Sequence, residues 1–175
     1  HIGFQFTNGE GLETILEGIT ITNGVAQNGG GALFVESSPT LRNVIFLENH
    51  AGPRSGIDGS GGAFLAYSYA SPHFIDCTFQ SNSCNWAGSA VCVYVFCEPI
   101  FTACTFYDNW ADGPGGAVFN YWGCNSTFVD CTFAGNVNTA LYGWPYTFFS
   151  YVSDLDLQNC TVYGNSSEVV FIHNY

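Results

Sequence analysis

The sequence predicts an all-β fold, a parallel β-helix built as a single-stranded solenoid of about six to seven coils. One short phrase recurs every 27 to 33 residues, and its five full copies begin at Pro39, Pro72, Pro99, Ser126 and Leu155. Each copy alternates apolar residues with others and is rich in aromatic and β-branched types, as strands are. Self-similarity at this period is typical of a solenoid, in which each repeat is one coil stacked on the next.

Each repeat contains the same elements in the same order. The phrase itself, for example PHFIDCTFQSN (72–82), predicts two short strands separated by a bend. A glycine-rich step such as Gly61-Gly62-Ala63 follows, and then an apolar strand such as AVCVYVF (90–96). Two or three short strands joined by Asn- and Gly-rich bends describe one coil. A copy at residues 14–23 lacks one residue, and we expect residues 1–175 to form one domain.

Two stretches carry a resemblance to known proteins, GGALFVESSPTLRNVIFLEN and GGAVFNYWGCNSTFVDCTFAGN. They resemble the right-handed parallel β-helix proteins of the pectate-lyase-like superfamily. The closer similarity is to secreted bacterial proteins with repeats of the form GGG-strand-SSPT-Φ-x-N-C-T-F-x-x-N. The resemblance spans roughly residues 14–165 and implies a right-handed coil. It leaves the function open, because one solenoid hosts lyases, hydrolases, adhesins and inert fibres.

Stacked coils place equivalent residues directly above one another, about 4.8 Å apart. This predicts two inner columns: Phe46, Phe79, Phe106, Phe133 and Val162, and Val44, Cys77, Cys104, Cys131 and Cys160. It also predicts an asparagine ladder at one bend, formed by Asn23, Asn49, Asn82, Asn109, Asn136 and Asn165. Asparagine suits a ladder at a bend because its amide both donates and accepts, and because it tolerates left-handed backbone.

The composition restricts the partners. The net charge is −12 and the strong cations are Arg42 and Arg54, so we expect neither nucleic acid nor anionic membranes to bind. The apolar runs are too short for a membrane span, and we expect no membrane insertion. Only 9% of the residues are charged, against about 25% in ordinary soluble domains, which indicates that part of the surface is covered.

Eight cysteines in an acidic chain without lysine predict a secreted, extracellular protein. The inner column is expected to consist of thiols, because a spacing of about 4.8 Å exceeds the usual Cβ separation of a disulfide. Cys97 and Cys124 lie at a bend where the backbone can adjust, and they are the first candidates for a disulfide. Cys84 and Cys92 form a second candidate pair. No Cys or His spacing fits a zinc site.

The sequence contains few residues placed as a catalytic site would need them. One bend column contains Asn43, Asp76, Ala103, Asp130 and Asn159. Its two aspartates are two coils, or about 9.6 Å, apart, too far to share one calcium ion. No lysine is present to act as a base, and Asp108 and Asp112 are expected to be solvated turn residues. We therefore expect no catalytic residue, no metal and no cofactor, and keep a polysaccharide lyase or glycoside hydrolase as the second alternative.

Two features favour assembly. The strand after each glycine step is apolar on both faces, so its outward face needs a cover, either a partner subunit or a loop such as residues 144–151. Tyr121, Trp122, Tyr142, Trp144 and Tyr146 extend this apolar tract. The ends also lack polar caps, and stacking onto further copies would extend such a coil into a filament. The residues expected at these ends are His1, Ile2, Phe4, Phe6, Val169, Phe171 and Tyr175.

The functional expectation is a structural, self-assembling extracellular protein whose partner is its own copy. Asn125, Asn159 and Asn165 each begin an N-glycosylation sequon, and attached glycans would cover part of the poorly charged surface. Asn125 is the best candidate, because it is expected in an exposed bend. The first alternative is a carbohydrate-binding or adhesive module in which exposed aromatic side chains such as Trp122 and Trp144 stack on sugars.

Overall fold

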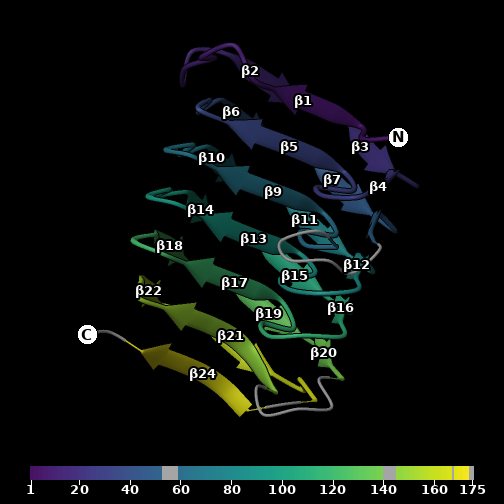
Figure 1. The fold of residues 1–175 in the computed structure, drawn as a ribbon, viewed down its shortest axis with the longest axis vertical. Helices are drawn as coiled ribbons and strands as arrows, with labels where there is room; N and C mark the ends of the chain where they lie inside the picture. The colour runs from purple at the N-terminus through teal and green to yellow at the C-terminus, as the bar shows by residue number, and fades with distance from the viewer. Residues whose placement is uncertain (53–58, 140–144, 167, 174–175) are drawn as a thin grey trace.

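The computed structural model describes residues 1–52, 59–139, 145–166 and 168–173. These residues form 24 β-strands wound into six coils, followed by the first strand of a seventh. Coils stack from the N-terminus at the top of Figure 1 to the C-terminus at the bottom. The fold is the all-β solenoid that the repeat period predicts.

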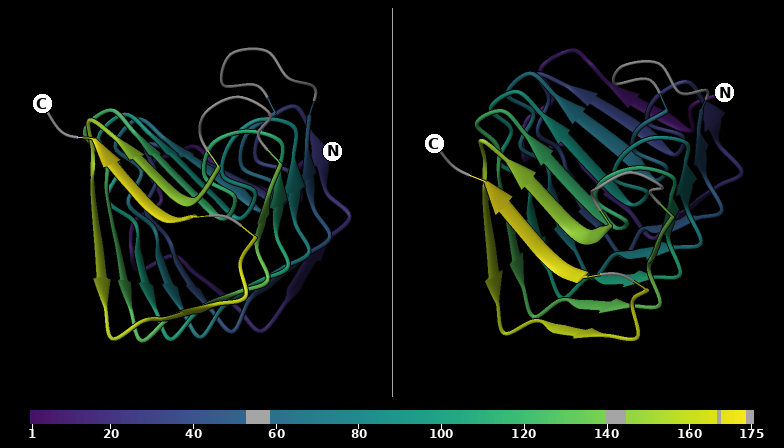
Figure 2. Two further views of the ribbon diagram at one scale, coloured as in Figure 1. Left: turned by 90° about the horizontal axis from the view of Figure 1, so that it is seen from below. Right: turned by 60° about the horizontal axis from the view of Figure 1, so that its bottom comes forward.

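Four parallel sheets run along the solenoid and form the walls of the coil (Figure 2). Sheet A contains β1 (Phe4–Phe6), β5 (Ala32–Val35), β9 (Phe64–Tyr67), β13 (Val91–Tyr94), β17 (Val118–Tyr121), β21 (Tyr146–Tyr151) and β24 (Glu168–His173). Sheet B contains β2 (Ile15–Glu17), β6 (Thr40–Arg42), β10 (His73–Ile75), β14 (Ile100–Thr102), β18 (Asn125–Val129) and β22 (Asp154–Gln158). Sheet C contains β3 (Thr20–Thr22), β7 (Ile45–Leu47), β11 (Thr78–Gln80), β15 (Thr105–Tyr107), β19 (Thr132–Ala134) and β23 (Thr161–Tyr163). Sheet D contains β4 (Val25–Ala26), β8 (His50–Ala51), β12 (Ser83–Cys84), β16 (Trp110–Ala111) and β20 (Val137–Asn138).

Each complete coil thus has four strands in the described residues, one more than the sequence indicates. The additional strand is the two-residue element of sheet D, which is too short to show an alternating pattern. Pairing is in register from coil to coil, so that Phe79 of β11 pairs with Phe46 of β7 and with Phe106 of β15. Register is fixed because a slip by one residue would turn every inward side chain outward.

The core is a set of stacked aromatic columns. Along sheet C the rings of Phe46, Phe79, Phe106 and Phe133 lie parallel, with successive centroids 5.0, 4.7 and 4.4 Å apart. The second predicted column, from Val44 through the cysteines to Cys131, is also buried, and its last member Cys160 is half-buried. All eight cysteines are present as thiols.

The asparagine ladder runs through five coils. The backbone N–H of Asn82 donates to the side-chain oxygen of Asn109 at 3.0 Å, and the Asn82 amide group donates to the same atom at 3.0 Å. The same pair of bonds links the ladder members Asn49, Asn82, Asn109, Asn136 and Asn165 to one another. These bonds use both functions of the amide.

Asn23 does not belong to this ladder. The N–H that donates to the Asn49 side chain is that of Gly24, at 2.9 Å, and Asn23 is exposed and bonds to Thr22. The expectation was wrong by one position because the first repeat is one residue short, and the pairing of Thr22 with Leu47 sets its register.

The left-handed backbone also lies elsewhere than expected. It occurs one residue before the ladder asparagine, for example at Glu48 (φ 53°), Ser81 (φ 53°) and Asp108 (φ 52°), and not at the ladder asparagines themselves. A second left-handed column turns sheet B into sheet C and contains Asn43, Asp76, Ala103, Asp130 and Asn159. The ladder therefore selects asparagine for its amide rather than for its tolerance of positive φ.

The outward face of sheet A is covered in part by this chain itself. Its first outward column, which includes Leu65, Cys92, Phe119 and Phe149, is buried. Trp86, from the segment between β12 and β13, and Tyr146, the first residue of β21, pack against it. A segment of the same chain therefore covers part of this column, but it is the one that carries Trp86. The loop expected at residues 144–151 is not the cover, because Tyr146–Tyr151 is strand β21 of sheet A itself. Arg54, Tyr142, Trp144 and Tyr175 lie outside the described residues.

The first and last described coils carry exposed apolar side chains. Phe4 and Val25 are exposed in the first coil and Val169 in β24, whereas Phe6 is buried beneath Phe34. The His1 ammonium is exposed and donates to the Val25 carbonyl oxygen. In each sheet the first and the last strand pair on one side only in the described residues.

Candidate functional site

The candidate site lies at the corner where sheet A turns into sheet B. In coils four to six this corner places bulky residues in left-handed backbone: Val95 (φ 63°), Phe96 (φ 54°), Trp122 (φ 64°) and Val152 (φ 49°). Such conformations cost about 1–3 kcal/mol each and cluster at functional sites. The corner between sheets B and C makes its turn with Asn, Asp and Ala instead.

The strained turns direct aromatic side chains into solvent. Tyr69, Phe96 and Trp122 come from three successive coils and are 64%, 47% and 60% exposed. The rings of Tyr69 and Phe96 stack with centroids 5.6 Å apart. The Phe96 ring lies over Gly123, where an added Cβ would be 2.5 Å from the ring, so glycine is required for this arrangement. We call these three side chains the aromatic row.

An apolar pocket of about 210 Å³ opens beside the aromatic row and is lined by Tyr121, Trp122, Tyr151 and Val152. The rings of Tyr121 and Trp122 are nearly perpendicular, at 87°, with centroids 6.5 Å apart. Tyr121 stacks on Tyr151 with centroids 5.5 Å apart, because the two residues are paired in β17 and β21. The pocket therefore has two aromatic walls at a right angle.

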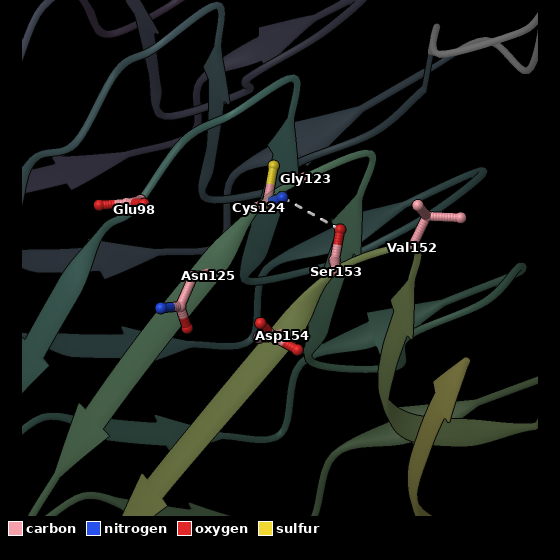
Figure 3. Close-up of a pocket in the computed structure, with 7 residues that line it drawn as sticks. All are labelled: Glu98, Gly123, Cys124, Asn125, Val152, Ser153 and Asp154. Atoms are coloured by element: carbon pink, nitrogen blue, oxygen red, sulfur yellow. Dashed lines mark hydrogen bonds between the residues drawn. The ribbon is translucent and has the colours of Figure 1, made fainter. Parts of the chain in front are cut away.

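A second, polar pocket of about 420 Å³ adjoins the first through Val152. Its lining consists of Glu98, Gly123, Cys124, Asn125, Val152, Ser153 and Asp154. Glu98, Asn125 and Asp154 come from successive coils and lie along one side of the pocket, with Val152 on the other (Figure 3). The Cys124 N–H donates to the Ser153 hydroxyl at 3.1 Å across the floor. We call this the acidic pocket.

A buried polar network holds the turn beneath the acidic pocket. Asn120 lies inward on sheet A, where the preceding coils have Ala66 and Val93, and it is fully buried. It accepts a hydrogen bond from the Ser126 hydroxyl at 2.7 Å and donates to the backbone oxygen of Asp154 at 3.1 Å. A buried polar group is stable only when it is hydrogen-bonded, so these bonds fix the turn that presents Asp154.

Cys97 and Cys124 are buried under the same corner in neighbouring coils. Each thiol donates to a carbonyl three residues earlier, at 3.1 Å for Cys97 and 3.2 Å for Cys124. Contact with the Cys97 side chain lowers the pKa of Cys124, and the same contact together with burial raises the pKa of Cys97. The two side chains are therefore in contact, and the same kind of contact links Cys77, Cys104 and Cys131 in the inner column.

The other candidate residues are dispersed. Cys84 packs with Ala51 and Ala111, whereas Cys92 lies in the cluster on the outer face of sheet A. Asn125 is exposed at the start of β18, while the amide of Asn165 is occupied in the ladder. Asn159 is exposed and donates to Asp130.

Glu98 and Asp154 were not singled out from the sequence. Both stand one residue before the start of a repeat, in a column that reads Ser38, Ser71, Glu98, Asn125 and Asp154. Reading each repeat one residue earlier would have shown two carboxylates in this column. The pocket itself could not be predicted, because it depends on the left-handed turns.

The described residues contain neither a cluster of metal ligands nor a membrane-spanning helix. No group of three or more His, Cys, Asp or Glu side chains is placed to hold a metal ion in the described part of the chain. Nor do the residues described include a helix that is long and apolar enough to cross a membrane.

The fold and its ladder define a parallel β-helix protein. The chain belongs to the right-handed β-helix family, whose model, described as "Right handed beta helix region", matches residues 54–175. This match supports the handedness implied by the sequence motifs. No curated protein and no solved structure matches the chain. The fold is found in enzymes and non-enzymes alike, so the function has to be argued from the site.

Proposed function

We propose that this protein is an extracellular carbohydrate-binding β-helix that holds a polysaccharide at the corner between sheets A and B. The observation that carries the proposal is the aromatic row, Tyr69, Phe96 and Trp122, with its two adjoining pockets. Exposed aromatic side chains gathered in one place are typical of recognition surfaces, whereas scattered ones are ordinary.

The geometry suits a linear polymer. The row advances by one coil, about 4.8 Å, from each ring to the next, which is close to the length of one sugar unit in an extended chain. A polysaccharide lying along the solenoid axis would therefore present successive sugars to successive coils. Because Tyr69 and Phe96 stack on each other, the sugars would contact the exposed edges of these two rings, while the hydroxyl groups of the sugars bond to polar side chains such as Asn125.

The proposal is binding without turnover, outside the cell. It remains in accord with the absence of lysine and the eight cysteines, which favour an exported protein. Glu98 and Asp154 are separated by the coil that carries Asn125, or about 9.6 Å along the axis. This spacing is far from the about 5–5.5 Å between the carboxylates of a retaining glycosidase and at the upper limit of the about 6.5–9.5 Å of an inverting one.

A glycan array tests the proposal. We expect the wild-type protein to retain at least one polysaccharide, and Trp122→Ala and Phe96→Ala to lose most of that binding. Tyr107→Ala is the matched control, because Tyr107 is a 43% exposed aromatic residue on sheet C, away from the corner. Equal binding by the Trp122→Ala and wild-type proteins would contradict the proposal, as would the absence of any bound glycan.

A second candidate function, self-assembly, is supported by the coil ends. Within the described residues, the strands of the first and last coils pair with a neighbour on one side only, and Phe4, Val25 and Val169 are exposed there. A second copy stacked head to tail would pair these strands and cover the apolar side chains.

Negative-stain electron microscopy and light scattering over rising concentrations of residues 1–175 test this second candidate. We expect filaments that shorten when Val25 is replaced by lysine, which places a charge at the proposed contact. Arg42→Lys, on a middle strand of sheet B, serves as the control. Monodisperse monomers at every concentration would rule out self-assembly and leave the glycan proposal intact.

A further inference from the structure

The charge of the acidic pocket narrows the class of glycan. Glu98 and Asp154 are both exposed and border the same cavity. The chain contains no lysine, and Arg42, the one arginine among the described residues, lies on β6 in the second coil. The described residues that line the pocket thus include two carboxylates and neither lysine nor arginine, within a chain of net charge −12.

We propose, building on the carbohydrate-binding function above, that the ligand is a cationic glycan: a polymer of hexosamine units with free, protonated amino groups. The sugar ring lies on the aromatic row, and an ammonium group on the sugar reaches the boundary between the two pockets. There it faces the aromatic walls on one side and the carboxylates on the other.

The aromatic pocket has the geometry that a cation favours. An ammonium group is attracted to the face of Trp or Tyr within about 6 Å of the ring centre. Trp122, which is 60% exposed, offers such a face, whereas the ring of Tyr121 lies between those of Tyr94 and Tyr151, with centroids 5.4 and 5.5 Å away. Val152 joins this pocket to the acidic one, and the carboxylates of Glu98 and Asp154 therefore lie within the same binding region.

Charge complementarity disfavours the other classes of glycan. A uronic acid polymer would be repelled by both carboxylates and by the acidic surface around them. A neutral glycan would partly remove the carboxylates from water without returning an opposite charge. A cationic sugar returns that charge, and the long-range field of the protein also draws it toward the surface.

The buried network makes the pocket ready for its ligand. Asn120 is bonded to the backbone oxygen of Asp154, and Ser153 is bonded to the Cys124 N–H, so the turn that carries Asp154 is fixed before binding. A fixed site avoids part of the ordering cost that binding otherwise imposes. The ligand would therefore meet a turn whose shape is already set by these two hydrogen bonds.

The experiment compares matched oligosaccharides by isothermal titration calorimetry. The probes are the glucosamine hexamer, its fully N-acetylated counterpart, a neutral glucose hexamer and an oligogalacturonate. We expect the free amine form to bind about tenfold more tightly than the N-acetylated form, since acetylation removes the charge and keeps the ring. We expect this preference to shrink as salt rises from about 0.05 M to about 0.5 M.

Variants assign the effect to the pocket. Glu98→Gln and Asp154→Asn are each expected to weaken binding of the glucosamine hexamer about two- to fivefold, and the double variant to abolish most of the preference over the N-acetylated form. Asp76→Asn makes the same charge change at an exposed position between sheets B and C, and it should leave the preference intact. Trp122→Ala should weaken binding of all the ligands that the protein retains.

The outcomes separate the two proposals. Binding of a neutral glycan that depends on Trp122, with equal affinity for both hexosamine forms, would overturn the cationic specificity and keep the carbohydrate function. Preference for the oligogalacturonate would do the same. A preference for the amine that Asp76→Asn reduces as much as Asp154→Asn would assign it to overall charge and overturn the site. Absence of binding to all four probes and to the glycan array would overturn both proposals.

Discussion

At the scale of single residues, the ladder asparagines do more than fill a bend. Asn109 accepts bonds from the backbone and the side chain of Asn82, and it donates to the Phe79 carbonyl at 2.8 Å and to the Asn136 side chain at 2.9 Å. It is fully buried. Removing this amide leaves several buried polar groups of neighbouring coils without a partner.

Asn109→Ala is therefore expected to lower the free energy of unfolding by about 2–4 kcal/mol, because each orphaned buried group costs about 1–3 kcal/mol. Asn23→Ala should change it by less than about 0.5 kcal/mol, since Asn23 is exposed and outside the ladder. Urea denaturation followed by circular dichroism measures both. Equal decreases in the free energy of unfolding for the two variants would mean that Asn23 belongs to the ladder, and would contradict the pairing of Thr22 with Leu47.

The paired thiols give a second prediction at this scale. Under oxidising conditions we expect a disulfide between Cys97 and Cys124, whose side chains are in contact at a corner where the backbone can adjust, while Cys77, Cys104 and Cys131 stay reduced in their column. The pKa values of Cys77 and Cys131 are lowered as that of Cys124 is, so the position at the corner distinguishes the pair. Peptide mapping after thiol labelling identifies the pair. A cross-link between any two of the three column cysteines would count against this assignment.

At the scale of elements, strand β15 shows how inward and outward side chains alternate, so that neighbouring residues differ in what they contribute to stability. Phe106 points inward and is fully buried between Phe79 and Phe133, while Tyr107 points outward. A buried ring stacked on both sides contributes its hydrophobic transfer and its contacts to the two neighbouring coils. Each strand is short, so the side-chain columns add to the backbone hydrogen bonds of the four sheets in joining one coil to the next.

Phe106→Ala is expected to lower the free energy of unfolding by about 3–5 kcal/mol, through lost burial and the cavity left between two rings. Tyr107→Ala, the neighbouring residue on the same strand, should cost less than about 1 kcal/mol. Thermal and urea denaturation of the two variants provide the comparison. A cost for Phe106→Ala no larger than that for Tyr107→Ala would mean that the inward and outward faces are assigned wrongly.

At the scale of the whole molecule, the repeat determines the fold and says little about the site. The period, the alternating apolar positions and the Gly steps predicted the solenoid and its inner columns, because every coil repeats the same burial. The site lies where the repeats differ: at the turns that hold Phe96, Trp122 and Val152 in left-handed backbone. Sequence reasoning named Trp122 as a residue that could stack on sugars, but it missed Glu98 and Asp154, because their grouping depends on the shape of those turns.

The in-register pairing of β10, β14 and β18 has a consequence for how such a protein changes length. Pro72, Pro99 and Ser126 begin successive repeats, and each strand of sheet B meets the next without an offset. A gene segment encoding one full turn could be copied or lost by unequal recombination while every remaining strand keeps an equivalent neighbour. The molecule could then lengthen or shorten in whole steps, and each added turn would extend the reach of its outer corner.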